Sequence, residues 1–282
     1  MLRILAPTDF SPGGFNATLV AMRLAQRLAC EVIFVHAMAK PPVPAASPED
    51  LFLMLYQEEE RSNRQKLHEE CQHLLDILNI RHAEIQYKIM VVPTPFAEAM
   101  LQIIYQEKID LVVIGSRGSS NLKKIFMGSN TKELMQLTPV PLLIIPSDVI
   151  FEGFSSITLL LQQKNQTFRP GITILERLAR TYEATLHFLV MTKDGQVIKD
   201  ISEISFDADD WHYLLKFPHT VNSMAEADEL AGIENHMEQT QTNLIVLFPD
   251  RRSVWVEFFS NDIADDLAGQ AKVPLLVLPN QA

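Results

Sequence analysis

Apolar and polar positions divide the first half of the chain into alternating predicted strands and helices. Between the strands, apolar residues recur every three or four positions, which predicts amphipathic helices. The run at 85–92 alternates with polar residues in its first part and predicts an edge strand with one wet face. Four other runs are nearly uninterrupted, as is typical of strands covered on both faces, at 2–6, 31–37, 111–114 and 141–145.

The second half of the chain repeats this plan. The segment PLLIIP at 141–146 returns as PLLVLP at 274–279, an offset of 274 − 141 = 133 residues. A repeat of that length predicts two homologous domains, and 282 residues also fits about two domains. We therefore expect an α/β protein of two tandem doubly wound domains, at 1–147 and 151–282. Each would have a five-stranded parallel sheet in the order 3-2-1-4-5.

The segment after the fourth predicted strand carries the clearest chemical signal. Gly115 and Gly118 follow the strand directly, and Gly128 and Ser129 open the next helix, with Ser129 as its expected cap. A helix N-terminus with free N–H groups beside glycines is suited to binding phosphate. From 116 to 132 there are four basic residues and no acidic one, in a chain of net charge -11. This patch indicates a bound polyanion, although a solvated loop face is the alternative.

Other binding motifs are weaker or absent. The sequence contains no Gly-x4-Gly-Lys-Ser/Thr loop and no Gly-x-Gly-x-x-Gly, so those two nucleotide classes are excluded. His68, Cys71 and His73 could suggest a metal site. On a helix, however, His68 and His73 would point about 140° apart, and we expect no metal there.

The spacing Gly-x2-Gly-x9-Gly-Ser, read in 115–131 as GSRGSSNLKKIFMGSNT, resembles the nucleotide-binding signature of the universal stress protein family in its ATP-binding branch. The resemblance implies an adenine nucleotide alpha hydrolase-like fold and ATP, alone or with Mg²⁺, as the ligand. Asn130 departs from the family, which more often has a small apolar residue there, so the choice among ATP, ADP and AMP stays open.

The resemblance also assigns roles to residues. It implies that backbone N–H groups around the glycines and the helix start cradle the phosphates, and that the end of the third strand meets adenine. Asp9 would contact the nucleoside, although a turn carboxylate or helix cap is the alternative from the residues alone. The expected nucleotide-binding residues are Pro7, Thr8, Asp9, Val91, Val92, Gly115, Arg117, Gly118, Gly128, Ser129, Asn130 and Thr131.

The second copy lacks this signature. The offset of 133 replaces the first glycine by Phe248 and the helix-start serine by Asp262. A bulky ring and a carboxylate both oppose phosphate binding, so we expect no nucleotide site in the second domain. At the same offset, Arg251 replaces Gly118 and Asn261 replaces Gly128. An offset of 154, set by the first helix, places Gln163 at the position of Asp9.

Family domains commonly pair through their last strands, and a tandem chain could satisfy that pairing within itself. Val140 to Ile145 and Val273 to Leu278 would then meet as an intramolecular pseudo-dimer, which removes two exposed sheet edges. Whether two chains also form a homodimer stays open.

The resemblance implies a nucleotide-dependent sensor or regulator of the stress response. The alternative is a slow ATPase or another nucleotide-hydrolysing enzyme on the same fold. We expect at most weak hydrolysis and no catalytic residues, because the sequence pairs no His with Ser or Cys and offers no general base near the glycines.

Composition indicates the cellular compartment of the protein and the classes of partner that it disfavours. No apolar run approaches the roughly 20 residues of a membrane span, and the N-terminus lacks a signal-peptide pattern. Two cysteines, Cys30 and Cys71, agree with a reducing compartment, and we expect a cytoplasmic protein. A pI near 5.2 argues against nucleic acid or an anionic membrane as the main partner.

Overall fold

The computed structural model describes residues 1–38, 49–93, 95–116, 128–162, 171–192, 196–198, 200, 213–225, 229–248 and 273–279. The strands of its first half are β1 (Arg3–Pro7), β2 (Glu31–Ala37), β3 (Gln86–Val92), β4 (Leu111–Gly115) and β5 (Leu142–Ile145). The helices are α1 (Pro12–Leu28), α2 (Glu49–Leu78), α3 (Phe96–Glu107) and α4 (Ser129–Leu137), with a 3₁₀ turn at His82–Glu84. The second half contains β6 (Ser156–Gln162), α5 (Ile172–Thr181), β7 (Thr185–Thr192), β8 (His219–Ala225), α7 (Glu229–Thr240), β9 (Leu244–Leu247) and β10 (Leu275–Val277).

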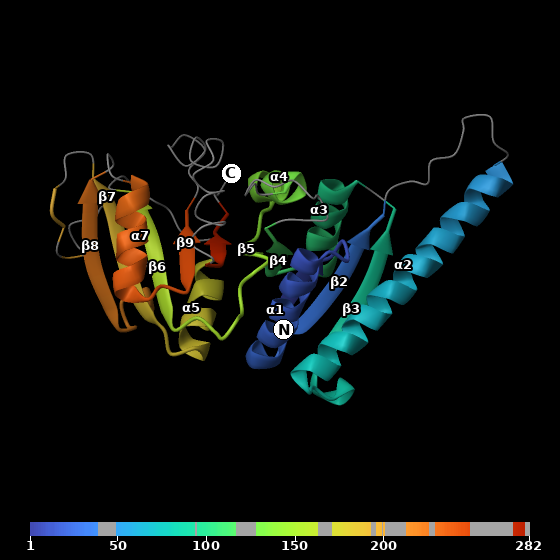
Figure 1. The fold of residues 1–282 in the computed structure, drawn as a ribbon, viewed down its shortest axis with the longest axis horizontal. Helices are drawn as coiled ribbons and strands as arrows, with labels where there is room; N and C mark the ends of the chain where they lie inside the picture. Colours follow the sequence, from blue (N-terminus) through green and yellow to red (C-terminus); the bar gives the residue numbers. More distant parts are fainter. Residues whose placement is uncertain are drawn as a thin grey trace.

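All ten strands form one sheet, in the order β3-β2-β1-β4-β5-β10-β9-β6-β7-β8 (Figure 1). Within each half the paired strands are parallel. The predicted order 3-2-1-4-5 and the reversal between β1 and β4 are therefore confirmed, and the second half repeats them. The prediction of an edge position for β3 is also confirmed.

The two halves are joined through their last strands, as the sequence predicted. β5 and β10 run antiparallel, with Leu276 opposite Leu143. Gly171, just before α5, has a φ of 99° and lies so close to the junction that a Cβ there would come within 2.7 Å of Pro141 Cγ and 2.8 Å of Leu278 Cδ2. Glycine is therefore required at this contact, both for its left-handed backbone and for the space.

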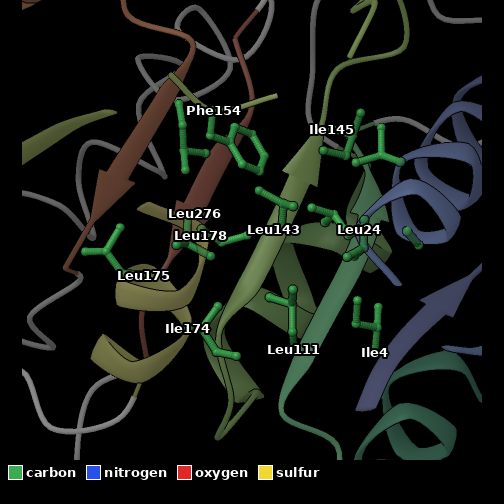
Figure 2. Packing of buried hydrophobic residues seen from close by; sticks show 14 of the residues in the cluster. Ile4, Leu24, Leu111, Leu143, Ile145, Phe154, Ile174, Leu175, Leu178 and Leu276 are labelled. Carbon is green, nitrogen blue, oxygen red and sulfur yellow. The ribbon is translucent and has the colours of Figure 1, made fainter. Parts of the chain in front are cut away.

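Helices cover both faces of the sheet and create two apolar layers. One core packs residues of α1, α2 and α5 against the sheet, and the other packs residues of α3, α4 and α7 against the opposite face. The first core crosses the junction: Leu24 of α1 and Leu178 of α5 lie on the same side as Leu143 and Leu276 (Figure 2). The junction thus belongs to one continuous core.

One strand was not apparent from the sequence. β8 reads HTVNSMA and has no apolar run, because it is an edge strand on which every side chain is at least partly exposed. Its pairing with the buried β7, from His219 opposite Leu186 to Ala225 opposite Thr192, makes it a strand in spite of its polar sequence.

Candidate functional site

The structure describes ten of the twelve predicted nucleotide-binding residues and brings them to the carboxyl edge of the first-half sheet. β1 and β4 pair in parallel with Ile4 opposite Leu111. Continuing that register brings Thr8 level with Gly115. Because the strand order reverses between these two strands, their carboxyl ends mark the position at which doubly wound sheets bind ligands, and we call this position the switch point.

The start of α4 is attached to the end of β4. The Gly128 N–H donates to the Ser116 carbonyl at 2.9 Å, and Thr131 Oγ1 donates to the Gly115 carbonyl at 3.0 Å. The Thr131 side chain is buried, whereas Ser129 and Asn130 are exposed. The first N–H groups of a helix have no intrahelical acceptor, so this anchoring holds the N-terminus of α4 beside the end of β4, near the switch point.

One detail of this segment differs from the prediction. The N-cap of α4 is Gly128 and not Ser129, because the Gly128 carbonyl accepts the Lys132 N–H at 3.0 Å and so begins the helical ladder. Gly115 is the last residue of β4 and does not have a positive φ. Its backbone is therefore that of a strand, and the absence of a Cβ leaves space at the end of β4.

The turn after β1 holds its polar groups in a fixed arrangement. Asp9 Oδ1 accepts the Ser11 N–H at 3.1 Å, and Thr8 Oγ1 accepts the Phe10 N–H at 3.1 Å. Asp9 is exposed and serves as the turn carboxylate that the sequence left as an alternative. Phe10 has a φ of 61°, a left-handed backbone that is costly for a bulky residue and must be held by the surrounding structure.

Gly14 in the first turn of α1 allows the helix to approach this turn closely. A Cβ at Gly14 would lie 2.8 Å from Asp9 Oδ1 and 3.2 Å from Thr8 Oγ1. Sequence reasoning missed this residue. Two consecutive glycines, Gly13 and Gly14, at the start of a helix were a usable signal, because glycine disfavours helix and needs another reason to be there.

Glu70 of α2 also contacts the site and was missed. Its Oε2 accepts a hydrogen bond from Thr8 Oγ1 at 3.4 Å, and its Oε1 accepts one from Thr18 Oγ1 at 2.9 Å. Burial raises the pKa of the Glu70 carboxyl above its ordinary value, the two threonine hydroxyls lower it, and the charge of Asp9 raises it further. No local pattern could reveal Glu70, because 62 residues separate it from Thr8.

A ring cluster holds the strained Phe10 in place. The His36 ring lies 4.5 Å from the Phe10 ring, and Lys66 Nζ lies 5.9 Å from its centroid. His36 Nδ1 is also 2.9 Å from the Thr8 carbonyl oxygen. Side chains from β2 and α2 thus orient the turn that carries Asp9.

The ends of β2 and β3 complete the edge. The Val92 carbonyl accepts the Met38 N–H at 2.9 Å, and Val91 is 8% exposed. β3 lies two strands away from β1, which corresponds to about 10 Å. A ligand that touched both Asp9 and the Val91–Val92 backbone would therefore have to lie across β2.

The remaining predicted positions are only partly described. Arg117 and Gly118 lie outside the described residues, so their contacts stay predictions. In the second half, Phe248 follows β9 and is 8% exposed. The other second-half counterparts lie outside the described residues: Gln163, Arg251, Asn261 and Asp262.

The opposite edge of the sheet also has a cavity. A cavity of about 410 Å³ lies at the opposite edge of the sheet, before β1, β4 and β5, and includes Asp110 and Arg177 but none of the predicted residues. Within the described ranges, no three His, Cys, Asp or Glu side chains gather as a metal site would require, and no helix is long and apolar enough to cross a membrane.

Comparison with known proteins identifies the family. Residues 1–146 match the family model described as the universal stress protein family, which is more than half of the chain. The chain belongs to this family. The family that the glycine spacing resembles is thereby confirmed.

Two sequence relatives match about half of the chain, and a solved structure matches both halves. Universal stress proteins from Methanocaldococcus jannaschii and Thermus aquaticus are each 28% identical, over 155 and 142 residues, which is 51% and 50% of this chain and 93% and 96% of the relatives. The crystal structure of a universal stress protein from Archaeoglobus fulgidus has a TM-score of 0.68, with 15% identity, over 99% of this chain and 98% of that chain. This third likeness shows that the tandem fold as a whole is that of a universal stress protein.

Proposed function

We propose that the first half of this universal stress protein binds one ATP, alone or with Mg²⁺, and that the protein acts as a nucleotide-dependent regulator of a stress response. The observation that carries the proposal is the anchoring of α4. Two hydrogen bonds, from Gly128 to Ser116 and from Thr131 to Gly115, hold its N-terminus beside the end of β4, near the switch point between β1 and β4. The matching glycine spacing supports a phosphate at this point.

The residues fit a nucleotide across the whole edge. Ser129 and Asn130 are exposed at the helix start, where N–H groups can bind phosphate oxygens. Asp9, about two strands from Val92, is at the right separation to contact a ribose while the Val91–Val92 backbone meets the base. Arg117 and the Gly118 N–H would add charge and a donor at the phosphates. Mg²⁺, when bound, would neutralise phosphate charge.

We further propose that the domains are 1–147 and 151–282 and that only the first carries a site. Phe248 supports this division, because a buried ring stands where the first half has Gly115. The two cysteines, Cys30 and Cys71, are free and buried, which supports a cytoplasmic location.

Calorimetric titration of the full chain with ATP and Mg²⁺ tests the proposal. We expect about one site per chain. Gly118→Val should abolish binding, because a branched side chain would displace the phosphate. The matched control is Arg251→Val at the repeat counterpart, which should leave the affinity unchanged. A stoichiometry of two, or loss of binding in the control, would contradict the assignment of a single first-half site.

The same protein distinguishes a regulator from an enzyme. A regulator should retain its nucleotide through many minutes, with phosphate release no faster than nucleotide dissociation. Native mass spectrometry of freshly purified protein would identify the retained nucleotide and count the subunits. Steady turnover much faster than dissociation would favour the hydrolase alternative instead.

A further inference from the structure

The N-terminal part of α2 extends beyond the sheet. The helix has 30 residues, which gives a length of about 45 Å, whereas the seven residues of β3 span about 23 Å. Figure 1 shows one end of α2 projecting away from the other elements. Among its described side chains, the buried ones begin only at the middle of the helix: Asn63, Leu67, Cys71, Leu74 and Leu75.

The sequence of this projecting part is apolar, and Tyr56 at its inner end is half-buried against the first core. Residues 51–56 read LFLMLY, and we call them the apolar tip. The exposed fractions are 44% for Leu51, 47% for Leu53, 67% for Met54 and 41% for Leu55. Neighbouring apolar side chains at such exposures mark a binding surface more often than a solvated one.

Acidic residues flank the apolar tip on both sides. Glu49 and Asp50 precede it, and Glu58, Glu59 and Glu60 follow it. Glu60 forms a salt bridge with Arg64 at 3.0 Å, and Arg61 is the first basic residue after the tip, so residues 49–64 carry five acidic and two basic residues and stay net negative. A partner for this surface must therefore combine an apolar contact with positive charge at its edges.

This charge pattern disfavours two simpler occupants. If two copies paired antiparallel with their tips in contact, Glu58 of one copy would lie opposite Glu49 of the other, and a parallel pair would place every acid opposite itself. Like charges in contact oppose such association. An anionic lipid surface would repel the same five carboxylates.

We propose that the apolar tip of α2 docks into an apolar groove of another protein whose edges carry lysine or arginine side chains. This is helix-in-groove recognition, with Leu51, Met54 and Leu55 as anchors at helical spacing. The proposal does not depend on nucleotide binding, because the tip is a separate surface from the sheet edge.

Site-specific photocrosslinking in the cells that naturally make the protein tests the proposal. A photoreactive amino acid replaces Met54 in the full chain, and a control places it at Tyr105 of α3, which is 70% exposed. The protein captured from Met54 and not from Tyr105 is identified and purified, and its affinity for the full chain is measured. We expect Met54→Glu to weaken binding at least tenfold, and reversal of Glu58, Glu59 and Glu60 to lysine to weaken it by a similar factor. Tyr105→Glu should change nothing.

Folding and stoichiometry controls keep the result interpretable. Because Met54 is exposed, Met54→Glu should keep the wild-type melting temperature. Added salt should weaken the complex, as expected for charges at a rim. Crosslinks mainly between copies of this chain or to lipid, capture no different from the Tyr105 control, or binding unaffected by charge reversal would each overturn the proposal.

Discussion

Leu276 of β10 lies directly opposite Leu143 of β5, and each is the repeat counterpart of the other. Their separation, 276 − 143 = 133, equals the offset of the sequence repeat. The neighbouring pairs follow the same symmetry: Leu275 faces Ile144, and Val277, the repeat counterpart of Ile144, faces Leu142, the counterpart of Leu275. The two halves therefore meet as an isologous pair, with a pseudo-two-fold axis passing between the two leucines.

This symmetry predicts the outcome of a double-mutant cycle. Leu143→Ala and Leu276→Ala should each reduce the free energy of unfolding by about 2–5 kcal/mol, because both side chains are fully buried. The two losses should be similar, and the double variant should lose less than their sum, since the residues face each other. Urea unfolding of the four proteins measures this. If the two single variants lost different amounts of free energy of unfolding and the double variant lost exactly their sum, this result would argue against the pseudo-two-fold axis.

Gly14 predicts a link between packing and ligand affinity. In Gly14→Ala the new methyl group would displace the Asp9 carboxylate, which lies 2.8 Å from the ideal Cβ position. We expect a loss of about 1–3 kcal/mol in the free energy of unfolding, although alanine is normally the better helix former. ATP affinity should fall several-fold if Asp9 contacts the nucleoside. Calorimetry and urea unfolding measure the two effects.

Gly232→Ala is the matched control for Gly14. A Cβ at Gly232 in α7 would meet the terminal methyl of Met224, which is the end of a flexible side chain and can move. This variant should keep full ATP affinity and lose little or no stability. Equal effects of both substitutions on ATP affinity would contradict a specific role for the Asp9 turn.

The second half contains polar side chains where the first half has an apolar core. Strand register and the offset of 133 align His187 with Ile33 and His236 with Ile103. His187 Nδ1 is 2.8 Å from Thr220 Oγ1, whereas His236 Nε2 is buried without a hydrogen-bond partner among the described residues. Burial, and then the nearby His187, lowers the pKa of His236 from 6.5 to about 4, and burial also lowers the pKa of His187.

These shifts predict the direction of acid sensitivity. A histidine with a lowered pKa stays neutral in the folded state, while the unfolded chain takes up a proton below its own pKa. Stability is thus full above pH 6.5 and falls as the pH approaches 4. For His236 alone the loss between pH 7.5 and 5 should be about 2 kcal/mol.

His236→Ile, which copies the first half, should remove most of this loss. Urea unfolding at several pH values measures it. His68→Gln, at an exposed position on α2, should keep the wild-type pH profile. If His236→Ile lost as much stability as the wild type between pH 7.5 and 5, other groups would be the cause of the acid sensitivity.

Most of the fold could be predicted because it depends on local patterns. Uninterrupted apolar runs indicated the buried strands of both halves, and the family resemblance, with two matching apolar last strands, implied that β5 and β10 would meet. β8 was missed because an edge strand with partly exposed side chains needs no apolar run. At the site, glycine spacing indicated the end of β4 and the start of α4, but not that Gly128 itself is the cap.

The sequence by itself determined the number of halves, the strand order and the edge of the sheet at which small residues gather. The strands and the two halves follow from hydrophobic periodicity and from the repeat, both of which are read directly along the sequence, and the strand order follows from the general rules for parallel α/β sheets. Only the tertiary structure decided that Glu70 meets Thr8 and that Gly14 lies against Asp9. Contacts between side chains of separate elements depend on where each helix docks on the sheet, and local patterning does not encode that position.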